Sequence, residues 1–99
     1  MACQAVALQA SFGNTRQLLR LAMKLKTIEQ VRADLALNLK SIRLSKGLAQ
    51  ERLALEADVD RTVVSKIERA VTNPSLDVLL RLANRLDVEL IDLLASNAD

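Results

Sequence analysis

Several residue types on which catalysis and covalent cross-linking depend are scarce or missing in this chain. Its 99 residues contain no histidine, tryptophan or tyrosine, and a single cysteine, Cys3. A thiol without a histidine beside it is weakly activated, and these residues offer no set of soft metal ligands. We therefore expect a binding protein that is not an enzyme and that holds no metal and no cofactor. A lone cysteine cannot close an internal disulfide, which favours a reducing, cytoplasmic location.

Helix breakers and long apolar runs are also rare. Two glycines and one proline leave few places to end a helix, so the composition predicts an all-α fold with short connections. Aromatic residues make up 1% of a chain that is 51% hydrophobic, so the core must be aliphatic. No apolar run approaches the roughly 18 residues of a membrane span, and no basic residue precedes the mildly apolar start. We expect neither a membrane segment nor a secretory signal.

The charged residues are unevenly distributed. The net charge is only +2, but basic residues dominate up to residue 33 and acidic residues dominate from residue 73 onward. An acidic end that faces away from phosphates fits a nucleic-acid partner. The same charges also fit an ordinary solvated surface, so they do not decide between the two interpretations.

The spacing of apolar residues divides the chain into four parts. Residues 1–14 predict an irregular tail. Residues 15–33 predict an N-terminal amphipathic helical extension, which no strong breaker separates from the next helix. Residues 34–95 predict a domain of five helices, and residues 96–99 predict a short tail. The five helices are expected from residue 34 to Lys46, over 50–57, over 61–69, from Leu76 to Leu86 and through Leu90 to Leu94.

Residues 50–69 have the pattern of two short helices joined by a tight turn. Each helix carries one apolar stripe at helical spacing, the first with Leu53, Ala54 and Ala57 and the second with Val63, Val64 and Ile67. The small side chain of Ala54 allows the second helix to cross closely over the first. Asp58 and Asp60 lie between the helices, where the chain turns and a new helix starts. This layout is that of a helix-turn-helix unit.

Four consecutive blocks resemble the phage-repressor-like, Xre-type family of helix-turn-helix transcriptional regulators. They are Leu39-Lys-Ser-Ile-Arg-Leu-Ser-Lys-Gly-Leu-Ala-Gln50, Val59-Asp-Arg-Thr-Val-Val-Ser-Lys-Ile-Glu-Arg69, Asn73-Pro-Ser-Leu-Asp-Val-Leu-Leu80 and Leu86-Asp-Val-Glu-Leu-Ile-Asp-Leu-Leu94. The resemblance implies a five-helix, lambda-repressor-like DNA-binding domain, here with an extra N-terminal helix. The Asp60-Arg61-Thr62 start of the second helix also resembles the controller proteins of restriction–modification systems.

The resemblance also implies residue roles. In this family the second helix of the pair lies in the major groove of double-stranded DNA and reads base edges. The implied base contacts are Arg61, Thr62 and Lys66, and the implied phosphate contacts are Gln50, Ser65 and Arg69. The family commonly pairs an arginine on the first domain helix with the glutamate of the Ile-Glu-Arg block. That implies a structural ion pair between Arg43 and Glu68.

Five positions depart from the family pattern. Ala49 stands where a capping serine or threonine is usual, and Glu89 replaces another capping serine. Asp58, Ala70 and Asp87 stand where glycine is frequent. None of these is a core or base-reading position, so we expect effects on turn geometry and stability only.

A domain of this size covers one half-site, so we expect a homodimer on an inverted-repeat operator. Two apolar stripes are candidate dimer interfaces. The favoured stripe, which resembles the usual dimer surface of the family, consists of Val88, Leu90, Ile91 and Leu94. The other stripe is N-terminal and consists of Leu18, Leu21, Leu25 and Ile28.

Two alternative functions stay open. Residues 1–33 would be a toxin-neutralising segment if the chain were an antitoxin with a toxin partner. The domain would be a protein-interaction module if it had lost DNA binding, although Gln50, Arg61, Thr62 and Lys66 argue against that. The operator sequence, activation versus repression and any effector stay undetermined, as does translation from Met1 or from Met23.

Overall fold

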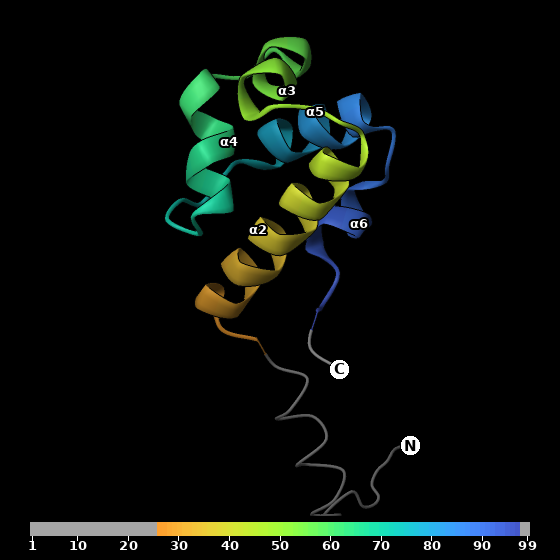
Figure 1. The fold of residues 1–99 in the computed structure, drawn as a ribbon. Helices are drawn as coiled ribbons and strands as arrows, with labels where there is room; N and C mark the ends of the chain where they lie inside the picture. The colour runs from red at the N-terminus through yellow and green to blue at the C-terminus, as the bar shows by residue number, and fades with distance from the viewer. Residues whose placement is uncertain (1–25, 98–99) are drawn as a thin grey trace, which may run out of the picture.

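The computed structural model describes residues 26–97, which form five helices and no strand. The helices are α2 (Ile28–Ser45), α3 (Gln50–Ala57), α4 (Arg61–Glu68), α5 (Leu76–Leu86) and α6 (Leu90–Leu94). The long α2 runs through the middle of the fold, with α4 on one side and α6 on the other (Figure 1). Helix α3 packs against both α4 and α5. The all-α fold expected from the composition is confirmed.

Helix α2 begins at Ile28, within the span expected for the N-terminal helical extension. Thr27 accepts a hydrogen bond from the Gln30 backbone N–H at 3.2 Å, and the Gln30 side chain accepts one from the Thr27 N–H at 2.9 Å. This reciprocal capping box satisfies two amides that a helix start otherwise leaves unpaired. The expected boundary between residues 33 and 34 therefore falls inside α2. The part of the predicted extension before residue 26 lies outside the described residues.

The core is aliphatic, and every described helix contributes to it. Its buried residues are Leu35, Leu39, Leu53, Ala54, Ala57, Val64, Ile67, Leu79, Leu82, Ala83, Leu86 and Leu93. Ala54 is completely buried, and α3 packs against α4, which fits the close crossing expected from its small side chain. The core therefore joins the helix pair to the other three helices as one unit.

Three turns use a left-handed backbone at residues other than glycine. They are Asp58 at φ 58°, Ala70 at φ 59° and Asp87 at φ 60°. All three are positions at which the sequence departs from the family's glycine. Aspartate can bond locally and tolerates this conformation, whereas alanine costs about 1–2 kcal/mol there. Arg81 donates to the Asp58 carbonyl at 2.9 Å and so stabilises the turn between α3 and α4.

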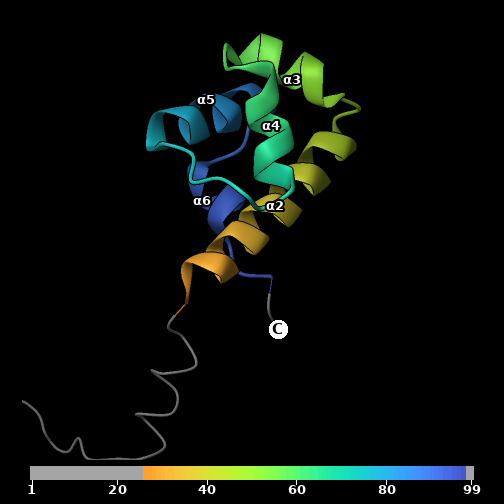
Figure 2. The ribbon, with the colours of Figure 1, turned by 90° about the vertical axis from the view of Figure 1, so that its left-hand side faces the viewer.

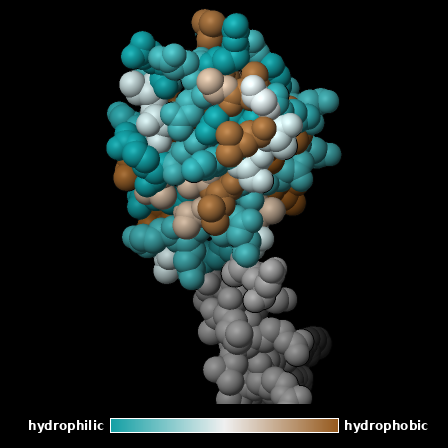
Figure 3. All heavy atoms as spheres, viewed as in Figure 1, coloured by the Kyte–Doolittle hydropathy of each residue, from teal (hydrophilic) through white to brown (hydrophobic). Residues whose placement is uncertain are grey.

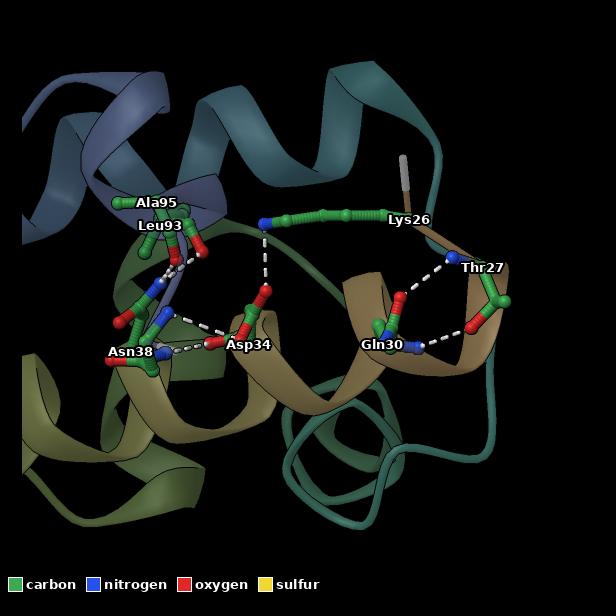
Figure 4. Close-up of polar contacts among 8 residues, drawn as sticks. Lys26, Thr27, Gln30, Asp34, Asn38, Leu93 and Ala95 are labelled. Carbon is green, nitrogen blue, oxygen red and sulfur yellow. Dashed lines mark hydrogen bonds and ion pairs between the residues drawn. The ribbon is translucent and has the colours of Figure 1, made fainter. Parts of the chain in front are cut away.

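The C-terminal end of α6 is tied to α2 by an amide side chain. Asn38 donates to the carbonyl oxygens of Leu93 at 2.9 Å and Ala95 at 2.8 Å, as Figure 4 shows. Carbonyls at the end of a helix have no partner within the helix, so Asn38 supplies the missing donor. A five-residue helix is thereby anchored in place.

Asp34 on α2 joins the segments that flank the domain. Its carboxylate accepts hydrogen bonds from the Lys26 ammonium at 2.8 Å and the Asn97 backbone N–H at 3.2 Å. The Asn97 side chain also donates to the Asp34 carbonyl at 3.2 Å. The hydrogen bond from Lys26, followed by that from Asn97, holds the pKa of Asp34 below its usual value. Asn97, expected in a free tail, is thus bonded to the first described helix.

The lowered pKa of Asp34 predicts a pH-dependent contribution to stability. A carboxyl whose pKa is lower in the folded state stabilises above its unfolded pKa, about 3.9, and loses that contribution as pH falls through the folded value. We expect Asp34→Asn to lower the melting temperature at pH 7, with a gap to wild type that closes as pH falls below about 4. Asp87→Asn, an exposed carboxylate at the end of α5, is the control. A gap for Asp34→Asn that is independent of pH would contradict this assignment.

Candidate nucleic-acid interface

Helix α4 has one buried face and one uncovered face. Val64 and Ile67 are buried in the core, and the helix packs against α2 and α3. Figure 1 places α4 at one edge of the fold, and the turned view in Figure 2 shows it in front of α2. The opposite face carries the exposed residues Arg61, Thr62, Lys66 and Arg69, with the half-buried Ser65 beside them. The structure therefore brings the four predicted contacts on α4 together with Arg69, the C-cap residue, on the outward side.

Asp60 fixes the start of α4. Its Oδ1 accepts the Thr62 backbone N–H at 2.9 Å and the Thr62 hydroxyl at 2.8 Å. These two bonds, the backbone one first, hold the pKa of Asp60 below its usual value. Asp60 is therefore an ionised acceptor at neutral pH, and it orders the turn from which Arg61 and Thr62 project. The sequence predicts the cap but not the second bond from the hydroxyl.

Arg61 is available for a partner. Its side chain is 78% exposed, and it lies 3.8 Å from the carboxylate of Glu51 on α3. Exposed ion pairs of this kind contribute little to stability, so the guanidinium can leave Glu51 at small cost. Arg61 and Lys66 thus present exposed cationic donors on the same helix face as the Thr62 hydroxyl.

Arg43 and Glu68 form a buried, two-pronged ion pair. The Arg43 Nε lies 2.7 Å from Glu68 Oε2, and a terminal nitrogen lies 2.9 Å from Oε1. The side chains are only 9% and 4% exposed. The remaining terminal nitrogen donates to the Leu48 carbonyl at 2.7 Å. The hydrogen bond to Glu68 raises the pKa of Arg43, so its charge is permanent. This pair connects the end of α4 to α2.

Gln50 has a partner within the chain as well as its predicted role. Its side-chain nitrogen donates to Glu68 Oε1 at 2.9 Å. The amide keeps a second N–H and its oxygen for other contacts. Ala49, at the N-cap of α3, makes no side-chain capping bond, as the departure from the family pattern predicts. Nothing in the spacing of Gln50 and Glu68 signals their contact, because it depends on how α3 docks against α4.

The candidate dimer residues on α6 divide between core and surface. Val88, Leu90 and Leu94 are partly buried and pack against the core, whereas Ile91 is 70% exposed. Helix α2 adds two exposed apolar residues that the sequence interpretation missed, Leu37 and Leu44. Figure 3 shows apolar side chains gathered along the middle of one face within a hydrophilic surround. Of the four predicted interface residues, Ile91 is the most accessible.

Helix α3, its turn and the outward-facing α4 define a helix-turn-helix domain of the DNA-binding, transcription-regulating class. The HTH_3 helix-turn-helix family model matches residues 39–93, and the chain belongs to this family. The resemblance to Xre-type regulators drawn from the sequence is confirmed. None of the helices among residues 26–97 combines the length and apolar character that a bilayer span requires.

Two curated relatives and two solved structures illustrate the similarity. The chain is 46% identical over 56 residues to control protein C.BamHI of Bacillus amyloliquefaciens, spanning 56% of this chain and 69% of the relative. It is 38% identical over 76 residues to a hypothetical transcription factor of Neisseria meningitidis, spanning 77% and 72% of the two chains. By their names, these relatives are a control protein and a hypothetical transcription factor.

The solved structures agree in fold. The Neisseria hypothetical transcription factor NHTF matches with a TM-score of 0.67 at 36% identity, over 75% of this chain and 85% of that one. The restriction–modification controller protein C.AhdI from Aeromonas hydrophila matches with a TM-score of 0.61 at 39% identity, over 63% and 94%.

The buried pair predicts an unequal response to two arginine substitutions. Arg43→Ala should lower the free energy of unfolding by about 3 kcal/mol or more, because it leaves Glu68 charged and buried without a cationic partner. Arg52→Ala is the control, since its side chain is 60% exposed and pairs with Glu56 at 3.4 Å. We expect the control to cost less than about 1 kcal/mol. Urea unfolding of both variants measures the difference, and equal losses would show that the pair does not hold the fold.

Proposed function

We propose that this chain regulates transcription by inserting α4 into the major groove of a specific double-stranded DNA sequence. The observation that carries the proposal is the two-sided character of α4. Val64 and Ile67 anchor one side in the core, while Arg61, Thr62 and Lys66 project from the other. An anchored helix with donors and acceptors on its free side has the form that base readout requires.

The side chains on this face suit particular atoms of DNA. Arg61 can donate two hydrogen bonds to the O6 and N7 acceptors of guanine, and Lys66 can donate to the same edge. Gln50, Ser65 and Arg69 flank the reading residues and are proposed to contact phosphates, which set the register without carrying sequence information. The relatives C.BamHI and C.AhdI support a finer proposal, that the chain controls a restriction–modification system.

Loss of a base-reading cation should weaken binding without unfolding the domain. Arg61→Ala or Lys66→Ala should each reduce specific binding by about 1–3 kcal/mol. Arg85→Ala removes the same charge from α5, where the arginine pairs with Glu56, and serves as the control. The site is first selected from random duplexes, and titrations then compare the variants at one salt concentration, since phosphate contacts make affinity salt-dependent. Equal binding by wild type and both α4 variants would refute the placement of α4.

We also propose that the chain acts as a homodimer on an inverted repeat. One domain contacts one half-site, and a two-fold axis would bring two copies of α4 into successive major grooves about 34 Å apart. The exposed Ile91 supports an interface through α6. Its side chain is 70% exposed, and covering it removes apolar surface from water, which is favourable. The hydrogen bond from Asn38 to the Leu93 carbonyl keeps α6 in a fixed position against α2, and a two-fold contact requires such a fixed surface.

A charged residue at position 91 should separate the subunits. Ile91→Glu places a like charge on both sides of the two-fold contact, so we expect a monomer in sedimentation at micromolar concentration and weaker binding to the selected site. Leu55→Glu is the matched control, because Leu55 is 72% exposed and lies on α3. The Leu55→Glu variant should remain a dimer in the same sedimentation experiment. A wild-type monomer together with an asymmetric selected site would refute the dimer.

The alternative functions receive no support from the described residues. Most of the segment proposed to neutralise a toxin, residues 1–33, lies before residue 26 and so outside the described residues. Failure of the wild-type chain to enrich any duplex would favour the protein-interaction module instead. A cytoplasmic location stays a prediction from the cysteine content.

A further inference from the structure

We propose that Asp60 restricts the Thr62 hydroxyl to accepting hydrogen bonds, so that Thr62 selects a base with an exocyclic amino group, adenine or cytosine. The inference rests on the proposed function, since it names the base class that this part of α4 reads. Beyond placing Thr62 against DNA, it specifies which kind of hydrogen bond the Thr62 hydroxyl can form there.

The geometry fixes where the hydroxyl hydrogen goes. A threonine hydroxyl has one hydrogen to donate and two lone pairs that can accept. The Thr62 hydroxyl lies 2.8 Å from Asp60 Oδ1, and the Thr62 backbone N–H donates to the same oxygen at 2.9 Å. A carboxylate can only accept, so the single hydroxyl hydrogen is committed to Asp60.

Asp60 remains a carboxylate under ordinary conditions. The two hydrogen bonds from Thr62 hold the pKa of Asp60 low, and the positive charges of Lys66 and Arg61 act in the same direction. Asp60 is also the N-cap of α4, so its side chain is held by the helix start itself. The acceptor that takes the hydroxyl hydrogen is therefore present whenever α4 is formed.

The bases differ in what they offer to such a group. In the major groove, adenine N6 and cytosine N4 donate, whereas guanine O6 and N7 and thymine O4 accept. A hydroxyl that can only accept is satisfied by the first two bases and faces lone pairs on the others. Arg61 and Lys66 carry donors only and favour acceptor edges. The reading face thus combines one acceptor with two cationic donors, which predicts an amino-versus-keto preference at the Thr62 position.

The test is selection from random duplexes followed by titration of single-base variants of the selected site. Thr62→Val removes the hydroxyl and keeps the branched shape, and Thr62→Ser keeps the hydroxyl. One operator position should favour adenine and cytosine in wild type and Thr62→Ser, and should lose that preference in Thr62→Val. Replacing the amino base by guanine or thymine should weaken wild-type binding about fivefold and leave Thr62→Val unaffected.

Asp60 variants separate the orienting role from simple contact. Asp60→Asn keeps an acceptor oxygen at the cap and should keep the amino preference. Asp60→Ala frees the hydroxyl to rotate and donate, so guanine and thymine should become tolerated at the same position. Thermal unfolding identifies a variant that fails to fold, and in that case the comparison of Thr62→Val with Thr62→Ser decides.

The two levels of the proposal fail in different ways. If wild type enriches no sequence, the proposed function is wrong and the inference falls with it. If wild type enriches a site but Thr62→Val prefers the same bases at every position, only the inference is overturned. It is also overturned if the position that responds to Thr62→Val favours guanine or thymine in wild type.

Discussion

The contact between Arg43 and Glu68 sets the position of α4. Arg43 on α2 donates hydrogen bonds to both carboxylate oxygens of Glu68 at the end of α4. It also donates one to the Leu48 carbonyl in the loop before α3. Gln50, the first residue of α3, donates to the same carboxylate. The Glu68 carboxylate therefore joins α2, α3 and α4, and the Arg43 guanidinium adds the loop before α3. The rest of the interface depends on this junction because α4 has eight residues and is too short to be a stable helix alone.

An ionic junction determines geometry in a way that the aliphatic core does not. Contacts of Val64 and Ile67 are non-directional, so they hold α4 against α2 and α3 while leaving its rotation loosely defined. A planar guanidinium with two bonds to one carboxylate accepts only a narrow range of orientations. Buried ion pairs add little net stability over a well-packed apolar pair, so the main effect here is positional. Arg61 and Lys66 lie on the same short helix and are positioned through it.

Most of the fold follows from local sequence patterns, because the helices are amphipathic and separated by recognisable turns. Apolar spacing predicts a helix across residues 28–45 but does not mark its start, because the capping box of Thr27 and Gln30 is a polar signal. The pairing of Arg43 with Glu68 came from the family resemblance alone. The contact between Gln50 and Glu68, and the exposure of Leu37, depend on how helices dock and have no counterpart in a one-dimensional pattern.

The residues that stabilise α4 and those that face outward are almost entirely separate, and Asp60 is the exception. Arg61 and Lys66 are exposed and lie outside the core, so substitutions at these positions leave stability nearly unchanged. Thr62 differs, because both its backbone N–H and its hydroxyl are bound by the N-cap. The same carboxylate oxygen, Asp60 Oδ1, caps the start of the helix and orients a side chain on the outward face of α4. A change at Asp60 therefore alters both the stability of the helix start and the orientation of the Thr62 hydroxyl.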